Sequence, residues 1–437
     1  MLEEAIIEQN PWWRVKESIL EDEKVKEALS KNKKLIYEFK DRANKIIFGP
    51  RQIGKTTYFK LLIYDLIFNK NIDPKSVCYF SCEILRNFKE LVELVRKIDL
   101  LSEGKKYIFL DEVTFVEEWQ RAIKYILDSP LSKNKIFYIT GSSSINLKKE
   151  NFPGRDVKIE EFLPLTFRQF LGIFGSPQLK RELRNIKFKS LKEIYENSQQ
   201  LLPHKNEIEK LFYKFLECGG FPRAFYELME NGKIREETYS IYWKWLIHDI
   251  AKINRSEKIA TGVLYAILKN YGTKFSLSSI SKETEIGSHV TVREYLEILE
   301  DLFAVRNFYT FDINKKKVLY RKMRKSYFVD PFLFYVVQRE LTGIKKLQHD
   351  KVVEGLVVEA MIRRLSKHNI GFYHNKKEID ICFGNFGIEI KWQENVDKRD
   401  FPNVNIKRKI LLSKNDSYFD EKNNILILPA HMFLSLV

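Results

Sequence analysis

The sequence has little of what marks a membrane or a secreted protein. No stretch of about 18 residues is apolar enough to span a bilayer. The first residues include Glu3 and Glu4, where an export signal carries lysine or arginine. Cysteine is scarce, and its four residues are scattered without the pairing of zinc ligands: Cys78, Cys82, Cys218 and Cys382. These absences predict a reduced, cytoplasmic protein that does not enter a membrane.

Internal repeats and low-complexity tracts are also absent. A chain of 437 residues is too long for one hydrophobic core, so two or three domains are expected. Acidic residues are fewer than basic ones: the sequence has 59 Asp and Glu and 75 Lys and Arg, which gives a net charge of +16. The excess favours a polyanionic partner, nucleic acid first, although a lysine-rich proteome would produce the same count.

The most specific motif has the GxxxxGK[ST] pattern of a phosphate-binding loop: Gly49-Pro50-Arg51-Gln52-Ile53-Gly54-Lys55-Thr56. The apolar residues 46–48 before it predict a buried strand, and residues 58–63 after it predict a helix. The glycines let backbone N–H groups point at phosphate oxygens, and the helix N-terminus adds a positive dipole end. Lys55 is expected to contact the β- and γ-phosphates, and the Thr56 hydroxyl to bind Mg2+.

A pair of carboxylates, Asp111 and Glu112, ends the apolar run 107–110. Alternating strands and helices in this region predict a parallel sheet, and such sheets bind ligands at their carboxyl edge. Asp111 is expected to hold Mg2+, and Glu112 to orient or deprotonate the attacking water. On its own such a pair is commonly a solvated turn, but downstream of a phosphate loop it indicates the second half of an ATPase site.

Two further positions are candidates for contact with the γ-phosphate. The buried strand predicted at residues 135–139 leads into Thr140 and Ser142, either of which could act as a sensor; an ordinary turn is the alternative. Arg155 lies on a loop and is a candidate arginine finger, in cis or from a neighbouring subunit, with a surface ion pair as the alternative.

The middle of the chain is predicted to be helical and then to form a winged helix. Residues 219–223, Gly-Gly-Phe-Pro-Arg, predict a tight turn between two helices of a helical region. Three helices and a hairpin follow, and the second strand region is basic. Such a wing favours contact with duplex phosphates, whereas a winged helix that only packs between domains is the alternative. Its cations are Lys315, Lys316, Lys317, Arg321, Lys322, Arg324 and Lys325.

The C-terminal region carries a spaced set of charged residues. Glu354 lies on a predicted helix, Asp380 on a strand, and Glu389 and Lys391 on the next strand. Period two places Glu389 and Lys391 on one face, and a turn at 384–387 would pair their strand antiparallel with that of Asp380. Asp380 and Glu389 could hold Mg2+ through oxygen, and Lys391 could orient a water for phosphodiester attack. A surface ion pair is the alternative.

These motifs resemble the prokaryotic, largely archaeal, AAA+ ATPases whose core is followed by a winged helix and a C-terminal restriction-endonuclease-like domain of PD-(D/E)xK type. The landmarks are residues 48–57, 110–113, 140–143, 154–155 before 163–165, 219–222, 353–355, 379–380 and 388–391. The sequence departs from many relatives at Gly355, where they carry Asn. The resemblance implies ATP and Mg2+ as cofactors and Gly49 to Thr57 with Ser142 as nucleotide contacts. It also implies Lys55, Glu112 and Arg155 as ATPase residues and Glu354, Asp380, Glu389 and Lys391 as a nuclease-like set.

The expected fold class is α/β: a P-loop ATPase core with a parallel sheet, a helical lid, a winged helix and a small α/β nuclease-like domain. The expected boundaries are 1–44 for an N-terminal helical segment whose charged helix ends near Lys40, then 45–175, 176–255, 256–349 and 350–437 for these four parts. The leading hypothesis is an ATP-hydrolysing protein that acts on DNA, with a candidate Mg2+-dependent nuclease domain and possible homo-oligomers. The alternative is a nucleotide-dependent switch, or an assembly module, whose nuclease-like domain is inactive.

Replacing Lys55 with alanine is expected to abolish nucleotide binding, because Lys55 is the cation that the loop positions for the β- and γ-phosphates. Isothermal titration with Mg-ATP measures this directly. Unchanged affinity in Lys55→Ala would refute the assignment of the ATP site.

Overall fold

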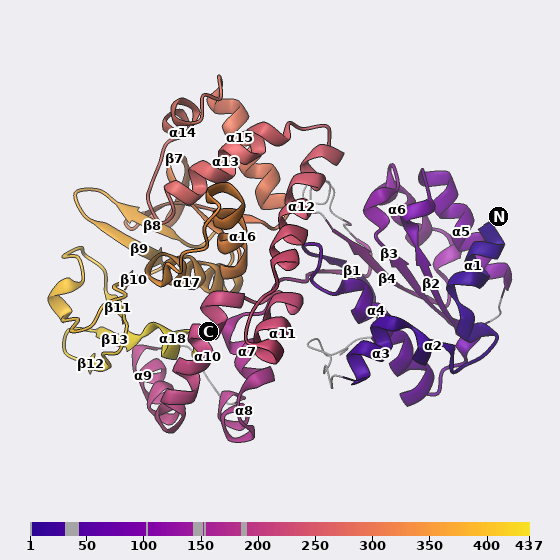
Figure 1. Ribbon diagram of the computed structural model, residues 1–437, viewed down its shortest axis with the longest axis horizontal. Helices are drawn as coiled ribbons and strands as arrows, with labels where there is room; N and C mark the ends of the chain where they lie inside the picture. Colours follow the sequence, from indigo (N-terminus) through magenta and orange to yellow (C-terminus); the bar gives the residue numbers. More distant parts are fainter. Residues whose placement is uncertain (1, 31–42, 102–103, 143–151, 153, 185–189) are drawn as a thin grey trace. The chain divides into compact units, whose positions relative to one another are not determined.

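The computed structural model describes residues 2–30, 43–101, 104–142, 152, 154–184 and 190–437 (Figure 1). Contacts divide the chain into two compact units, Met1–Leu163 and Pro164–Val437. Within the described part of the chain, no helix is both long and apolar enough to cross a membrane.

Unit 1 is built on a parallel sheet, as the alternation of apolar runs predicts. Its strand order is β2-β3-β4-β1-β5, and each neighbouring pair is parallel. Apart from β5 the strands are almost fully buried, which explains their near-continuous apolar sequence. The strands are β1 (Asn44–Phe48), β2 (Val77–Ser81), β3 (Lys106–Asp111), β4 (Lys135–Gly141) and β5 (Val157–Glu161).

Three helices follow strands of this sheet. They are α4 (Lys55–Tyr64), which continues into a π-helical turn at Asp65–Asn69, α5 (Phe88–Leu101) and α6 (Trp119–Asp128). α4 packs on the sheet through Phe59, whose ring meets Phe109 edge-on at 5.1 Å between centroids. β1 lies between β4 and β5, so the phosphate loop that follows it emerges beside the ends of these two strands.

The N-terminal segment satisfies the backbone of the edge strand β2 with side chains. It contains α1 (Leu2–Gln9), a short 3-10 turn at Pro11–Trp13, α2 (Ser18–Glu21) and α3 (Glu23–Ser30). Asn10 exchanges two hydrogen bonds with the backbone of Tyr79, and both indole N–H groups of Trp12 and Trp13 donate to the Val77 carbonyl. Both tryptophans therefore contact the sheet that follows them in the sequence. The expected helix end near Lys40 lies outside the described residues.

Unit 2 begins with helices that meet at a Gly-Gly turn. The helices are α7 (Phe167–Phe174), α8 (Pro177–Leu183), α9 (Leu191–Gln200), α10 (Lys205–Cys218), α11 (Pro222–Asn231) and α12 (Glu236–Lys252). At the turn, the carbonyl of Gly220 accepts a hydrogen bond from the N–H of Leu165, and its own N–H donates to the buried Asp330 carboxylate at 2.7 Å. Asp330 also caps α16 (Pro331–Thr342) by accepting a hydrogen bond from the Phe332 N–H. The turn thus joins three segments that are distant in sequence.

Three helices and a hairpin follow in the predicted order. They are α13 (Glu257–Lys269), α14 (Leu277–Glu283), α15 (His289–Asp301), β6 (Val305–Asp312) and β7 (Lys317–Phe328). Ser276 caps α14 with a capping box and Ser288 caps α15, as the serine positions suggest. The winged-helix assignment itself stays a prediction.

The hairpin is not a free wing, because it is part of an eight-stranded sheet with the order β12-β13-β11-β10-β9-β8-β6-β7. Thr310 on β6 pairs in parallel with Phe372 on β8, so the sheet runs across the expected boundary at residue 349. The other strands are β8 (Gly371–His374), β9 (Glu378–Phe383), β10 (Phe386–Ile390), β11 (Arg408–Ser413), β12 (Tyr418–Asp420) and β13 (Ile425–Pro429). The helices are α16 (Pro331–Thr342), α17 (His349–Leu365) and α18 (Ala430–Leu436).

The expected hairpin at residues 384–387 is present: β9 and β10 are antiparallel, with Ile381 opposite Ile388. β11 adds in parallel to β10, and β13 adds in parallel to β11.

His431 on α18 makes unit 2 sensitive to acid. It is 1% exposed, and neither ring nitrogen has a hydrogen-bond partner among the described residues. Burial, reinforced by the charge of Lys205, lowers the pKa of this imidazole from 6.5 to about 4. The folded chain therefore keeps His431 neutral at a pH where the unfolded chain takes up a proton.

Protonation of His431 in the unfolded chain lowers the free energy of unfolding once the pH falls below 6.5. The loss grows by roughly 1.4 kcal/mol per pH unit as the pH falls towards 4. We expect His431→Leu to remove this loss, whereas the same change at the exposed His289 leaves the pH dependence as in the wild type. Unfolding by denaturant between pH 7.5 and 4.5 gives the difference. Parallel curves for the wild type and His431→Leu would contradict it.

Candidate functional site

The phosphate loop joins β1 to α4, with Lys55, Thr56 and Thr57 in the first turn of the helix. Gly54 has φ +92°, a conformation that glycine adopts without strain. Lys55 is 4% exposed, and its Nζ donates to the carbonyls of Gly49 and Pro50, both at 2.9 Å. The ammonium is therefore held inside the loop, at the N-terminus of α4.

Asp111 ends β3 and is held by hydroxyls from both neighbouring strands. Tyr79 on β2 donates to Asp111 Oδ2 at 2.9 Å, and Thr140 on β4 donates to Oδ1. The same Thr140 oxygen accepts the N–H of Glu112 at 2.9 Å. Thr140 was a candidate γ-phosphate contact, but here its hydroxyl donates to the Asp111 carboxylate and accepts from the backbone N–H of Glu112. Tyr79 was not predicted, because its contact with Asp111 depends on strand order.

Glu112 has one carboxylate oxygen near Lys55 and one without a partner among the residues that the structure describes. Oε1 lies 3.9 Å from Lys55 Nζ, while Oε2 is buried and accepts no hydrogen bond from any described residue. The backbone of Glu112 is left-handed, with φ +53°. A strained, non-glycine conformation and an unsatisfied buried oxygen are together typical of a functional position.

These residues fit a magnesium ion. The Thr56 hydroxyl and the Asp111 carboxylate supply oxygen donors that Mg2+ prefers, and the open Glu112 oxygen is available to accept a hydrogen bond from a water. Ser142 is buried directly after β4, at the same edge of the sheet. Arg51 extends from the loop with its guanidinium 5.8 Å from the Phe115 ring.

Arg155 does not lie at this edge. It pairs with Asp128 at the end of α6, with Nε 2.8 Å from Oδ1. Arg155 precedes β5, which is parallel to β1, so the length of the strands separates it from the phosphate loop by about 15 Å. The cis arginine finger is therefore not supported, and contact with a neighbouring subunit's nucleotide stays a prediction.

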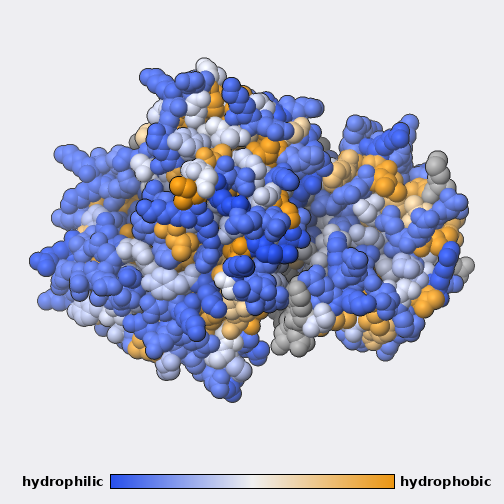
Figure 2. Space-filling view, in the orientation of Figure 1, coloured by the Kyte–Doolittle hydropathy of each residue, from blue (hydrophilic) through white to orange (hydrophobic). Residues whose placement is uncertain are grey.

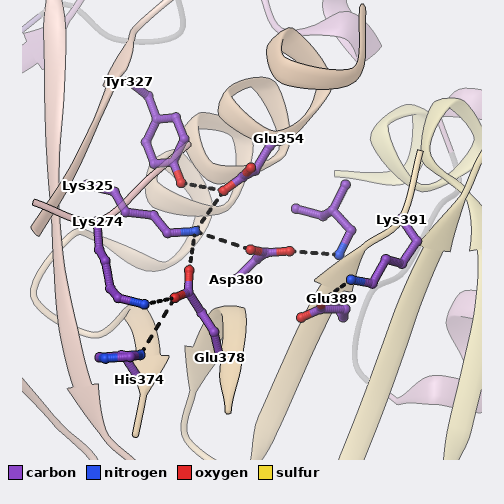
Figure 3. Close-up of polar contacts among 10 residues, drawn as sticks. Lys274, Lys325, Tyr327, Glu354, His374, Glu378, Asp380, Glu389 and Lys391 are labelled. Atoms are coloured by element: carbon purple, nitrogen blue, oxygen red, sulfur yellow. Dashed lines mark hydrogen bonds and ion pairs between the residues drawn. The ribbon is translucent and has the colours of Figure 1, made fainter. Parts of the chain in front are cut away.

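The nuclease-like set of unit 2 comes together on one face of the sheet (Figure 3). Because Ile381 faces Ile388, the next opposed pair is Asp380 and Glu389, whose side chains share a face. Lys391 Nζ lies 3.0 Å from Glu389 Oε1, and the N–H of Ile390 donates to Asp380 Oδ2 at 3.0 Å. Glu354 approaches from α17.

Gly355, at the position where the resemblance leads one to expect Asn, packs against Tyr271. A Cβ at this position would lie 2.2 Å from the Tyr271 hydroxyl. The tyrosine thus fills the space beside Glu354 that a side chain at position 355 would need.

The centre of the set is occupied by Lys325, which the sequence assigns to a DNA-binding wing. Its side chain is 1% exposed, and Nζ lies 2.9 Å from Glu354 Oε1, 2.9 Å from Glu378 Oε1 and 3.2 Å from Asp380 Oδ1 (Figure 3). Arg324 is also buried, 5.2 Å from the Tyr309 ring. Assigning these two cations to the DNA-binding surface was wrong. Four wing cations are exposed: Lys315, Lys316, Lys317 and Arg321.

Glu378 and Tyr327 were not predicted as members of this cluster. Lys274 Nζ donates to Glu378 Oε2 at 2.8 Å, and the Tyr327 hydroxyl donates to Glu354 Oε1 at 2.6 Å. Lys325 and Tyr327 are two residues apart on β7 and so share a face. The alternation of residues along β7 could have shown that Lys325 and Tyr327 share a face, but the surrounding basic residues suggested an exposed strand instead.

Burial dominates the electrostatics of the cluster. It raises the pKa of Glu389 to about 7, with the charge of Asp380 adding to the effect, and the same two causes raise the pKa of Glu354. Burial would lower the pKa of Lys325, but the charges of Glu354, Asp380 and Glu378 raise it above the ordinary lysine value. Across the described ranges, no group of three or more His, Cys, Asp or Glu side chains is arranged to hold a metal ion.

Comparison with known proteins adds a family match. Residues 41–171 match the family model of an AAA domain, and residues 209–347 match that of a domain of unknown function. An uncharacterized protein of Methanocaldococcus jannaschii is 28% identical over 78% of this chain and 72% of its own length. An uncharacterized protein of Haemophilus influenzae is 26% identical over 79% of this chain and 80% of its own length.

Solved structures with some likeness include the Thermotoga maritima RuvB Holliday junction branch migration motor, at a TM-score of 0.27 and 15% identity. It covers 67% of this chain and 88% of its own. The Aeropyrum pernix ORC1 protein in complex with DNA has a TM-score of 0.29 and 14% identity, over 81% and 97% of the two chains. Residues 41–171, which match this family model, carry the phosphate loop and the parallel sheet, and they are called the AAA domain after that match.

Proposed function

We propose that the AAA domain binds Mg-ATP and hydrolyses it, and that the chain uses this hydrolysis while bound to duplex DNA. One observation carries the first part: Lys55, Asp111 and Glu112 gather at the carboxyl edge of the sheet, where one Glu112 oxygen is buried and has no partner in the described part of the chain.

Each of these residues has a role that follows from its position. The loop N–H groups and Lys55 bind the β- and γ-phosphates. When nucleotide binds, the Lys55 ammonium leaves the carbonyls of Gly49 and Pro50 and donates to phosphate oxygens instead. Thr56 and Asp111 would hold Mg2+, which neutralises charge on the phosphates. Glu112 orients the attacking water and accepts its proton. Tyr79 and Thr140 fix the Asp111 carboxylate in one orientation.

The DNA partner is supported by charge. The exposed cations Lys315, Lys316, Lys317 and Arg321 lie at the turn of the β6–β7 hairpin and on its second strand. Figure 2 shows that the visible face of unit 2 is mostly hydrophilic, with small and separate apolar areas. Such a surface suits a charged partner better than an apolar one. Homo-oligomers would give Arg155 a neighbouring nucleotide to contact.

The second candidate function is a nucleotide-dependent switch whose C-terminal domain binds without cutting. The observation that favours it is the Lys325 ammonium at the centre of the nuclease-like set. A Mg2+-dependent nuclease, the first hypothesis for this domain, requires a metal ion beside Asp380 and Glu389.

Glu112→Gln is expected to keep Mg-ATP bound but to slow its hydrolysis by roughly 100-fold or more, because an amide cannot accept the proton of the attacking water. Single-turnover hydrolysis beside a binding titration measures both quantities. Glu118→Gln is the matched control: Glu118 has the same φ of +53° but is exposed, and turnover should be unchanged. Wild-type hydrolysis in Glu112→Gln would remove Glu112 from the mechanism.

Replacing Lys315, Lys316, Lys317 and Arg321 together by alanine should weaken duplex binding and flatten its dependence on salt. Removal of one cation that binds a phosphate reduces the slope of log affinity against log salt by roughly 0.9. Fluorescence anisotropy at several salt concentrations provides the slope. A variant with four exposed lysines of unit 1 replaced serves as the control: Lys24, Lys26, Lys75 and Lys89. Equal affinity and slope in the two variants would show that the hairpin does not contact DNA.

A further inference from the structure

We propose that the Lys325 ammonium takes the place of a divalent cation in the nuclease-like cluster, so that the C-terminal domain folds around an internal cation and is closed to Mg2+ and Mn2+. The inference concerns unit 2 and does not depend on ATP hydrolysis.

The first argument is geometric. An ammonium has three N–H donors, and Lys325 has three carboxylates within 3.2 Å: Glu354, Glu378 and Asp380. They come from α17 and β9, while the lysine comes from β7. A divalent ion would need the same oxygens at about 2.0 to 2.6 Å, and two cations cannot share them without strong repulsion.

The second argument is burial. An ammonium that is 1% exposed is stable only when its charge is compensated, and the surrounding carboxylates are stable only with a cation among them. Lys325 and the cluster thus require each other in the folded state. Tyr327 donates to Glu354 and Lys274 donates to Glu378, so the carboxylates around Lys325 are held by donors of the chain itself. One oxygen of the neighbouring Glu389 is buried and has no partner among the described residues.

The third argument is the place of the lysine in the fold. β7 pairs with β6 along the hairpin, and β6 joins β8 of the C-terminal sheet. Lys325 is therefore a fixed part of the sheet rather than the end of a free wing. The second Asp380 oxygen is taken by the Ile390 N–H, which leaves Glu389 as the remaining acid of the predicted metal pair.

The test is Mn2+ binding to the nucleotide-free full chain, followed by electron paramagnetic resonance. The wild type should bind no Mn2+ that depends on Asp380, so wild type and Asp380→Asn should give the same titration. Lys325→Ala should gain one Mn2+ per chain, at least tenfold tighter than any site in the wild type. Its melting temperature should be low without Mn2+ and rise by several degrees with it. Adding Asp380→Asn should remove the gained site.

Lys274→Ala is the matched control, since it removes the other lysine that contacts Glu378, and it should gain no Mn2+ site. The proposal is overturned if the wild type binds Mn2+ and Asp380→Asn loses it. It is also overturned if Lys325→Ala folds, as judged by circular dichroism, but gains no Mn2+. Should Lys325→Ala fail to fold, the comparison of the wild type with Asp380→Asn still decides.

Discussion

Buried charge that must be compensated governs the construction of unit 2. Helix α17 is held against the hairpin by two such contacts, Glu354 with Lys325 of β7 and Glu359 with Arg306 of β6, each at 2.9 Å. Breaking a buried ion pair by removing one partner leaves an uncompensated charge in a low-dielectric interior, which is strongly destabilising. The two contacts therefore fix the helix against both strands, and β9 is tied to the same centre by Asp380 and Glu378. The sheet, the helix and the hairpin form one body for this reason.

In unit 1 the buried polar contacts orient the residues of the nucleotide site. There the buried groups are not fully compensated: Asp111 is held by the hydroxyls of Tyr79 and Thr140, but one oxygen of Glu112 has no partner in the described part of the chain. Around Lys325 three carboxylates share one ammonium, although one oxygen of the neighbouring Glu389 is also buried without a partner among the described residues. The occupied centre of that cluster favours a framework role for the C-terminal domain, and the open Glu112 oxygen near Lys55 favours the AAA domain as the place of chemistry.

The features that local pattern determines were predictable. The phosphate loop, the apolar strands, the hairpin before Glu389 and the shared face of Glu389 and Lys391 all follow from spacing within a few residues. Lys325, Glu378 and Tyr79 were missed because their contacts depend on which strands become neighbours. The pairing of β6 with β8, which carries Lys325 to the cluster, has no signature in either strand. A run of basic residues reads as exposed because most lysines are, and only the strand period distinguishes Lys325 from its neighbours. Arg155 was placed near the nucleotide by its position in the sequence, whereas the direction of β5 puts it at the other edge.

The N-terminal segment has a consequence for the integrity of the sheet. An edge strand with free N–H and C=O groups is a template on which another chain can add a strand, and proteins block such edges by several means. On β2 the block is made of side chains: Gln9, Asn10, Trp12 and Trp13 occupy the hydrogen-bonding positions that a further strand would use. The residues before the AAA domain thus act as a cap against intermolecular strand addition. A truncation that removed them would expose unpaired backbone groups of β2 to other chains. β2 also carries Tyr79, whose hydroxyl orients Asp111.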